Sequence, residues 1–213
     1  MILLTGFEPF GGATTNPSWA AARSAARLLA AEGHDVRAVE LPCVFGASAR
    51  ELEDALQRFR PELVLCAGQA GGRARISLER IAINCDDARI PDNSGNRPVD
   101  EPVVPGGPAA YFTSLPVKAA LAALTAEQIP AEVSQSAGTY VCNHVFYALM
   151  HALRNYPGTR GGFVHVPYEE AQLPAGSGAP SLPAPQMAAA LAVVVRTALT
   201  TPTDMKLAAG ATH

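Results

Sequence analysis

Residues 62–73, ELVLCAGQAGGR, join a short apolar run to a glycine-rich turn. Because a brief apolar run that ends at turn residues is typical of a buried strand, we predict a strand over Glu62–Ala67. Similar runs recur along the chain and alternate with longer segments in which apolar residues follow a helical spacing. This alternation indicates an α/β domain whose sheet is largely parallel.

The neighbouring segments extend this pattern in both directions. Asn16 precedes Pro17, and a capping side chain followed by proline favours a helix start, so a helix is expected from Pro17 to about Ala31. The other expected helices cover residues Ala47–Phe59, 116–128, 143–154 and 185–199. The other expected strands cover Ile2–Thr5, Val36–Leu41, Ile76–Asn84, Ala131–Gln135 and Gly162–Val166.

Residues 86–114 interrupt the pattern with repeated prolines, glycines and acids. A long segment without regular structure inside a domain is usually a functional loop or disordered. Tyr111 and Phe112, together with Val103 and Val104, favour an ordered loop that covers a site or meets another subunit. No linker divides the chain, so we expect one domain over residues 1–199 and a frayed tail over 200–213.

The composition excludes several classes of protein. The net charge of -3 gives no basic surface for nucleic acid or for an anionic membrane. No apolar run approaches the roughly 20 residues that span a bilayer, and the first residues resemble a strand rather than a signal peptide. We therefore expect a cytoplasmic protein with reduced thiols. The four cysteines lack a C-x-x-C pair, which argues against a zinc site, a redox motif or a disulfide scaffold.

Cys142 holds the most suggestive position among the cysteines. It directly precedes Asn143 and a run of apolar residues at helical spacing, so its thiol lies at a predicted helix N-terminus. Free N–H groups and the helix dipole stabilise a thiolate there, which lowers the thiol pKa and favours a nucleophile. The alternative, a small buried core residue, stays open for Cys142. It is the preferred interpretation for Cys43, Cys66 and Cys85.

A cysteine nucleophile needs a base, and His165 is the best-placed histidine. It lies at the end of the strand predicted over Gly162–Val166, and sites in α/β sheets form beyond the carboxyl ends of strands. His144 is too close to Cys142 along the helix to reach back easily, so we expect a structural donor. His34 and His213 are expected to be solvated.

Glu79 stands inside an apolar stretch, where a carboxylate is costly unless it is paired. It either forms a salt bridge with Arg80 or Arg75, or orients a histidine as the acid of a triad does.

The glycine-rich turn at residues 68–72 also follows a strand, so a phosphate-binding loop has to be considered. The turn matches neither G-x-G-x-x-G nor a Walker A sequence. A turn that lets the backbone approach a substrate closely fits equally well.

Four segments carry a resemblance to a known family. They are residues 4–12 (LTGFEPFGG) with 16–19 (NPSW), residues 68–73 (GQAGGR) with 76–84 (ISLERIAIN), residues 136–144 (SAGTYVCNH), and residues 162–168 (GFVHVPY). In this order they resemble the bacterial and archaeal pyroglutamyl peptidase I (pyrrolidone-carboxylate peptidase) family. The likeness runs from residue 1 to about residue 199.

The resemblance implies a three-layer α/β/α fold around a twisted, largely parallel mixed sheet, and a homotetramer. It implies a cysteine peptidase that removes N-terminal pyroglutamate from peptides through a thioester, without metal or organic cofactor. Cys142 would be the nucleophile, His165 the general acid/base and Glu79 the residue that orients His165. The substrate-binding residues would be Phe7, Phe10, Asn16, Gln69, Arg89, Ile90, Tyr140 and Val141, with Arg89 near the oxyanion.

Two features depart from the family's usual pattern. Tyr140 stands where some relatives carry phenylalanine, and Cys43 replaces a threonine, so a pocket contact there is expected to differ. Two other classes remain open. One is a small-molecule hydrolase or phosphorylase that binds phosphate at the glycine-rich turn, and the other is a non-catalytic homologue that only binds its ligand.

Overall fold

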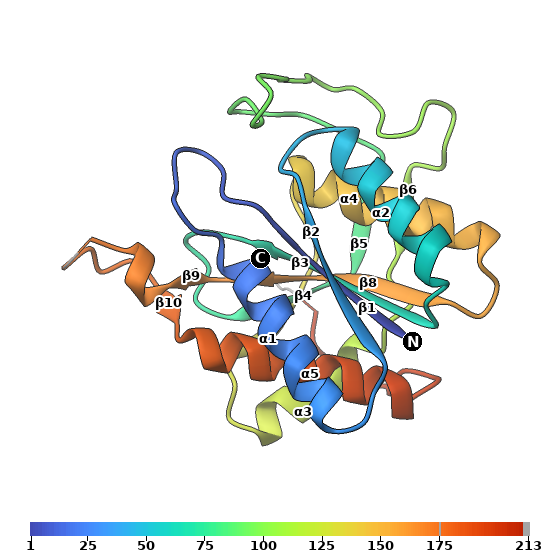
Figure 1. Cartoon of the computed structure of the whole chain (residues 1–213), viewed down its shortest axis with the longest axis vertical. Coiled ribbons are helices and arrows are strands. Elements are labelled where there is room, and N and C mark those ends of the chain that lie inside the picture. Colours follow the sequence, from blue (N-terminus) through green and yellow to red (C-terminus); the bar gives the residue numbers. More distant parts are fainter. Residues whose placement is uncertain (175, 211–213) are drawn as a thin grey trace.

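A sheet of six strands crosses the centre of the computed structural model, which describes residues 1–174 and 176–210 (Figure 1). In spatial order the strands are β2 (Val36–Leu41), β1 (Ile2–Phe7), β3 (Leu63–Gln69), β8 (Arg160–Val166), β4 (Ile76–Glu79) and β7 (Ala131–Ser134). The first four are parallel, β4 is antiparallel to β8, and β7 is parallel to β4. The predicted largely parallel, mixed sheet is confirmed.

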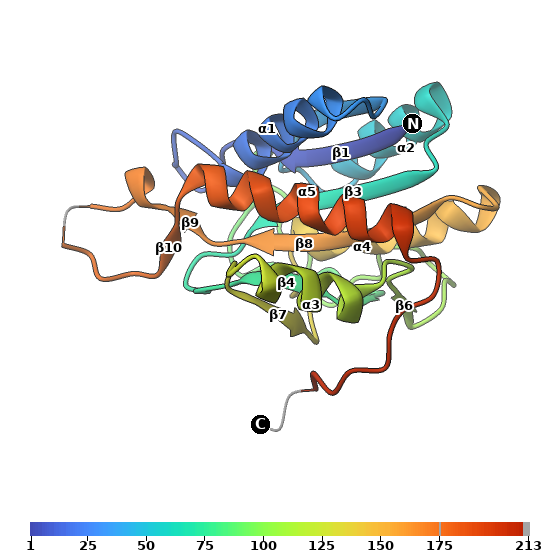
Figure 2. The same cartoon turned by 90° about the horizontal axis from the view of Figure 1, so that it is seen from below.

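Helices cover both faces of this sheet, which gives the expected three layers (Figures 1 and 2). One face carries α1 (Pro17–Ala31), α3 (Val117–Ala126) and α5 (Ala184–Thr200), and the other carries α2 (Ala47–Phe59) and α4 (Val141–Ala152). A short 3₁₀ turn, η1 (Leu153–Asn155), follows α4. In the part of the chain that is described, no helix combines the length and apolarity needed to cross a bilayer.

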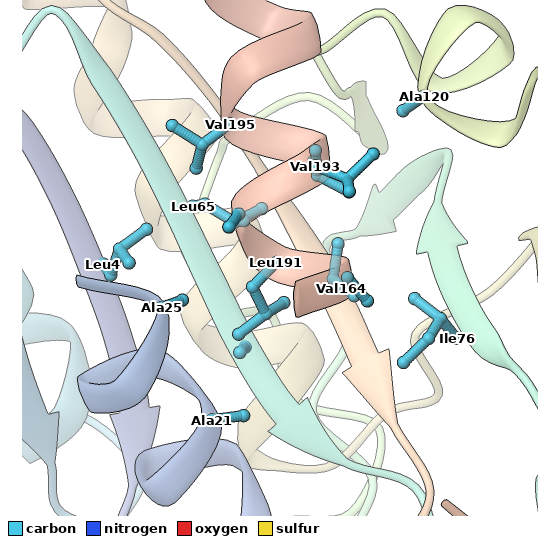
Figure 3. Packing of buried hydrophobic residues seen from close by; sticks show 14 of the residues in the cluster. Leu4, Ala21, Ala25, Leu65, Ile76, Ala120, Val164, Leu191, Val193 and Val195 are labelled. Carbon is cyan, nitrogen blue, oxygen red and sulfur yellow. The ribbon is translucent and has the colours of Figure 1, made fainter. Parts of the chain in front are cut away.

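The core forms two layers because successive side chains of a strand point to opposite faces. On β1, Ile2 and Leu4 join the cluster beneath α1 and α5, whereas Leu3 and Phe7 join the cluster beneath α2 and α4. Figure 3 shows the first cluster, where Ala21 and Ala25 of α1 and leucine and valine residues of α5 meet the sheet. Small residues on α1 let this helix lie close to the strands.

The start of α1 is held against the end of β1. The Asn16 side chain accepts hydrogen bonds from the Ser18 N–H and Ser18 Oγ, at 3.0 and 2.8 Å, which confirms the predicted cap. The Phe7 N–H in turn donates to Ser18 Oγ. A Cβ atom at Gly6 would lie 2.5 Å from the Trp19 backbone, so only glycine permits this approach. The contact fixes the loop between β1 and α1.

The single strand predicted over Ile76–Asn84 is wrong, because the segment breaks at Arg80. Its first half is β4, while β5 (Ile81–Ile83) pairs with β6 (Ala110–Phe112) in a separate antiparallel sheet. Asn143 of α4 binds the backbone N–H and carbonyl of Ile83. These bonds hold β5 against α4, away from the central sheet.

Residues 86–114 form an ordered loop with little regular structure, as expected, apart from β6 within it. The Asp92 carboxylate accepts hydrogen bonds from the N–H groups of Phe45, Ser94 and Asn96. The Asn84 side chain likewise holds the Val104 backbone through both its oxygen and its nitrogen. Side-chain hydrogen bonds therefore replace strand and helix pairing in this loop.

The chain after β8 forms a projecting arm, which lies at the left of Figure 1. It contains β9 (Tyr168–Glu169), the 3₁₀ turn η2 (Glu170–Gln172) and β10 (Ser181–Leu182), with β9 and β10 parallel. The arm leads back into α5, and the single domain over residues 1–199 stays a prediction.

The expectation of a frayed tail after residue 199 is wrong for the residues next to α3. The Asp204 carboxylate accepts hydrogen bonds from the N–H groups of Lys118 and Ala119, at 3.0 and 2.9 Å. Lys118 Nζ also donates to the Leu207 carbonyl. Asp204, more than 80 positions away in the sequence, thus accepts from the free N–H groups at the start of α3. No local sequence pattern predicts this cap. Residues 211–213, including His213, lie outside the described residues.

We expect Asp204→Ala to destabilise the protein because two N–H groups of α3 lose their acceptor. Loss of a capping side chain costs about 0.5–2 kcal/mol, and the free energy of unfolding in urea would measure it. Asp54→Ala provides the control, since Asp54 is exposed on α2. Equal stability of the two variants would contradict a capping role for the tail.

Candidate active site

A pocket of about 190 Å³ opens beyond the carboxyl ends of β1, β3 and β8. Seven of the residues expected at the site line it: Phe7, Phe10, Asn16, Gln69, Tyr140, Cys142 and His165. Five further residues complete the lining: Cys43, Ala70, Arg73, Ala137 and Gly138. The sheet therefore brings together side chains that lie up to 158 positions apart, from Phe7 to His165.

Cys142 is the second residue of α4, which begins at Val141 rather than at Asn143 as expected. Its thiol lies against the glycine-rich turn, since a Cβ atom at Gly68 would be 2.7 Å from Cys142 Sγ. Gly68 of β3 is paired with His165 of β8 in the sheet. The absence of a side chain at Gly68 thus lets the thiol lie beside the strand position that faces His165.

The other two glycines of this turn meet two different requirements, close packing at Gly71 and a positive φ at Gly72. A Cβ atom at Gly71 would overlap the phenol of Tyr168, and Gly72 has a φ of +86°, which favours glycine. The turn therefore packs closely against the side chains of Cys142 and Tyr168, and the close approach of its backbone to a substrate stays a prediction.

The ionisation of Cys142 differs from the expectation. Burial raises the pKa of the thiol, Cys43 and Glu79 raise it further, and the guanidinium of Arg73 lowers it. The expected lowering is wrong in direction, because removing the thiolate from water outweighs the favourable position at the helix N-terminus. A base beside Cys142 therefore favours formation of the thiolate, the nucleophilic form.

His165 and Glu79 form a buried pair. His165 Nδ1 lies 2.7 Å from Glu79 Oε1, and the two side chains are 5% and 0% exposed. Because Nδ1 faces the carboxylate, it carries the proton, and Nε2 is left as the acceptor nitrogen. Of the two interpretations of Glu79, the structure shows the histidine partner. The salt bridge with Arg80 or Arg75 does not form among the residues described.

Arg73 is the residue of this cluster that the sequence pattern did not reveal. Its Nη1 lies 2.7 Å from the same Glu79 Oε1, and its guanidinium also donates to Ser134 Oγ and to the Ser136 carbonyl. The only available signal was a basic residue six positions before a carboxylate in an apolar stretch.

His144 has both ring nitrogens engaged away from the pocket. Nδ1 lies 2.7 Å from Asp86 Oδ2, and the Gly46 N–H donates to Nε2 at 3.0 Å. This arrangement ties α4 to the loop at residue 86 and to the start of α2. It agrees with the expected structural role of His144 and leaves His165 as the histidine in the pocket.

Phe7, Phe10 and Tyr140 give the pocket an aromatic wall. The Tyr140 ring packs against Phe10 and Phe45, with centroids 6.1 and 5.4 Å apart. The Tyr140 hydroxyl donates to the Pro91 carbonyl, which joins this wall to the loop of residues 86–114. Cys43 also faces the pocket, at the position where a changed contact was expected.

Two of the predicted polar contacts are already engaged with the protein. The Asn16 side chain caps α1 and donates to the Glu8 carbonyl, which commits it to the loop after β1. Gln69 Oε1 accepts a hydrogen bond from Gln172 Nε2 at 3.2 Å. The amide nitrogen of Gln69 is therefore the group that this side chain offers to a ligand.

Three of the residues expected to bind substrate do not line the pocket. Arg89 and Ile90 are exposed on the loop that carries Pro91, and Val141, the first residue of α4, is buried in the core. Glu79 lies beneath the pocket, behind His165. Arg89 and Ile90 are linked to the Tyr140 wall through the next residue of their loop, Pro91, whose carbonyl accepts a hydrogen bond from the Tyr140 hydroxyl.

The chain is similar to known proteins of one family along nearly its whole length. The family model described as pyroglutamyl peptidase matches residues 1–201. A pyrrolidone-carboxylate peptidase of Streptomyces coelicolor is 54% identical, over 100% of this chain and 99% of its own length. The corresponding protein of Klebsiella pneumoniae is 52% identical, with the same coverage.

Solved structures resemble the chain equally closely. The crystal structure of pyroglutamyl peptidase I from Bacillus amyloliquefaciens superimposes with a TM-score of 0.90 at 47% identity, and it covers 96% of this chain and 98% of that one. A mutant pyrrolidone carboxyl peptidase from P. furiosus gives a TM-score of 0.84 at 42% identity, covering 93% and 98%. Sequence and fold, matched along nearly the whole length, place the chain in the pyroglutamyl peptidase family.

Proposed function

We propose that Cys142, His165 and Glu79 are the catalytic residues with which this chain, a cysteine peptidase, removes N-terminal pyroglutamate from peptides. The observation that carries the proposal is the pocket that Cys142 and His165 both line, with Glu79 bonded to Nδ1 of His165. Nucleophile, base and orienting acid are the three parts that acyl transfer by a thiol requires.

The first half of the reaction forms a thioester. Nε2 of His165 accepts the Cys142 proton as the sulfur attacks the pyroglutamyl carbonyl, and the Glu79 carboxylate stabilises the imidazolium that results. His165 then gives this proton to the departing amine.

The second half releases pyroglutamate. Water, deprotonated by His165, attacks the thioester carbonyl, and the Cys142 sulfur leaves and recovers a proton from His165. In both halves the oxyanion needs donors. The first N–H groups of α4 have no acceptor within the helix, and Cys142 lies in that first turn, so these groups are the donors we propose for the oxyanion. The contribution expected of Arg89 stays a prediction.

Substrate recognition follows from the chemistry of the lactam. A pyroglutamyl residue carries no ammonium group, so shape and hydrogen bonds must select it. The aromatic walls around Phe10 and Tyr140 suit the flat ring, and the Gln69 amide nitrogen is a donor for the lactam carbonyl. A prolyl residue lacks that carbonyl and would leave the donor unpaired, which is a strong basis for discrimination.

The test of the function is release of a fluorophore from a pyroglutamyl amide, with the prolyl amide as the ring-matched control. We expect release from the pyroglutamyl substrate alone, and loss of release after iodoacetamide treatment. Alkylation at Cys142, located by peptide mass mapping, should match the loss of activity mole for mole. Release that survives complete alkylation of Cys142, or equal release from both amides, would contradict the proposal.

We also propose that the chain acts in the cytoplasm as a homotetramer that binds neither nucleic acid nor membrane. The exposed side chains of Phe112 and Val99, 67% and 66% exposed, give the loop of residues 86–114 an apolar surface suited to a subunit contact. The net charge of -3 supports the absence of nucleic-acid partners. The mass in solution, measured by light scattering, tests the oligomeric state.

A further inference from the structure

Arg73 shares one carboxylate oxygen with the proposed base. Glu79 Oε1 lies 2.7 Å from Arg73 Nη1 and 2.7 Å from His165 Nδ1. Glu79 Oε2 is buried and has no hydrogen-bond partner among the described residues. All of the polar contacts of this carboxylate therefore converge on a single oxygen, between a permanent cation and an imidazole.

The position of Arg73 is fixed from a neighbouring strand. Its Nη1 lies 3.3 Å from Ser134 Oγ at the end of β7, and its Nη2 lies 3.1 Å from the Ser136 carbonyl. The Arg73 side chain is 30% exposed, whereas Glu79 is fully buried. An ionised carboxylate in such a place is stable only with a paired charge, and Arg73 supplies that charge without involving His165.

We propose that Arg73 is a positioning residue that keeps Glu79 ionised while leaving His165 free to act as a neutral base. The inference rests on the proposed function, because it assigns to Arg73 a role in the activation of Cys142. Without a neighbouring cation, the buried carboxylate would have His165 as its partner. The pair would then hold a proton at rest, and His165 could not accept one from the thiol.

The charges around the pair determine the direction of the effect. Arg73 is a cation in contact with the Glu79–His165 pair, and the neighbouring α4 contributes the Cys142 thiol and His144, which is bonded to Asp86. Two such close groups take up protons as a unit. Removing the positive charge of Arg73 makes the pair bind its proton at higher pH, whichever residue carries it.

Arg73 also lowers the pKa of the Cys142 thiol, so its removal is expected to raise that pKa as well. Cys43, Cys66 and Glu79 all disfavour the thiolate of Cys142, and Arg73 favours it. Arg73 lines the pocket together with Cys142, so this effect acts across the site itself. One substitution is therefore expected to move two separate titrations, that of the base and that of the nucleophile.

The test compares Arg73→Gln, Arg73→Lys and Arg75→Gln by kcat/KM profiles against pH. Arg75 lies two residues away, is exposed, and provides the matched loss of a guanidinium. We expect Arg73→Gln to lower kcat/KM roughly 100-fold at neutral pH, mainly through kcat. The acidic limb of its kcat/KM profile should lie about one pH unit higher than in the unsubstituted protein. Arg73→Lys should keep the position of the limb, and Arg75→Gln should resemble the unsubstituted protein.

The second measurement is the rate of Cys142 alkylation by iodoacetamide against pH, followed by mass spectrometry. We expect the curve of Arg73→Gln to lie at higher pH than those of Arg73→Lys and Arg75→Gln. The proposal would be overturned if Arg73→Gln lost activity while the acidic limb of its kcat/KM profile and its alkylation curve stayed at the pH of the unsubstituted protein. A shift of the acidic limb to higher pH in Arg73→Lys would also overturn it. Because Arg73→Lys keeps the positive charge, this variant decides the question if Arg73→Gln does not fold.

This design separates the two proposals. If the unsubstituted protein fails to cleave the pyroglutamyl amide, the proposed function is wrong, but the alkylation curves still report whether Arg73 controls the thiol. If the enzyme is active and neither titration moves in Arg73→Gln, only the role of Arg73 is wrong.

Discussion

Cys142→Ala is expected to abolish release of the fluorophore from a pyroglutamyl amide. The substitution removes the sulfur that forms the proposed thioester, and the other thiol of the pocket, Cys43, lies between β2 and α2 rather than at the start of α4. Removal of a nucleophile from a triad lowers kcat by about 10⁵-fold or more, so the residual rate should be close to the background. The initial rate at saturating substrate is the measurement.

Cys85→Ala is the matched control for this result. Cys85 is also a free, partly exposed thiol, but it does not line the pocket. It should retain the activity of the unsubstituted protein, and both variants should keep the same far-UV spectrum and melting temperature. A folded Cys142→Ala variant that still cleaves the substrate would show that Cys142 is not the nucleophile.

Much of the fold is readable from local sequence, because most elements carry their own signals. Asn16 and Pro17 mark the start of α1, and the alternation of apolar runs marks the parallel strands. The break at Arg80 carries no such signal, since β4 and β5 are both apolar. It depends on Asn143, which binds the Ile83 backbone from another part of the chain. The Asp204 cap of α3 is likewise invisible in the local sequence.

The candidate site likewise combines residues that local sequence predicts with contacts that only the fold determines. Cys142 and His165 stand at the ends of a helix and a strand, which is why their positions alone suggested chemistry. The partner of Glu79 could not be chosen from the sequence, because Arg73, Arg75 and Arg80 are all within reach along the chain. Only the pairing of β4 with β7 and β8 places Ser134 and His165 on either side of the Arg73–Glu79 contact. The raised pKa of the thiol depends on burial, which no local pattern gives.

Glu79→Gln is expected to lower kcat/KM by roughly 10²- to 10³-fold, less than the loss of Cys142. The amide is nearly the same size as the carboxylate and can still meet Nδ1 of His165, so the pocket should keep its shape. It cannot stabilise the imidazolium that forms when the thiol gives up its proton. The deficit should therefore appear in kcat and leave KM nearly unchanged, as a steady-state analysis will show.

Glu132→Gln is the control for the same chemical change on the adjacent strand β7, where Glu132 accepts a hydrogen bond from Ser77. It should keep full activity. A loss from Glu79→Gln equal to that from Cys142→Ala, in a protein of unchanged stability, would mean that Glu79 does more than orient and stabilise His165.

The double variant Glu79→Gln, Arg73→Gln adds the decisive comparison. In Glu79→Gln the guanidinium of Arg73 loses its anionic partner and still faces the site, where its charge now opposes formation of the His165 imidazolium. Removing that charge should cost little further activity, or restore some of it, although the Arg73 substitution alone is costly. Two residues that act through one shared oxygen must give such a non-additive cycle. Additive losses would show that Glu79 and Arg73 support the reaction independently.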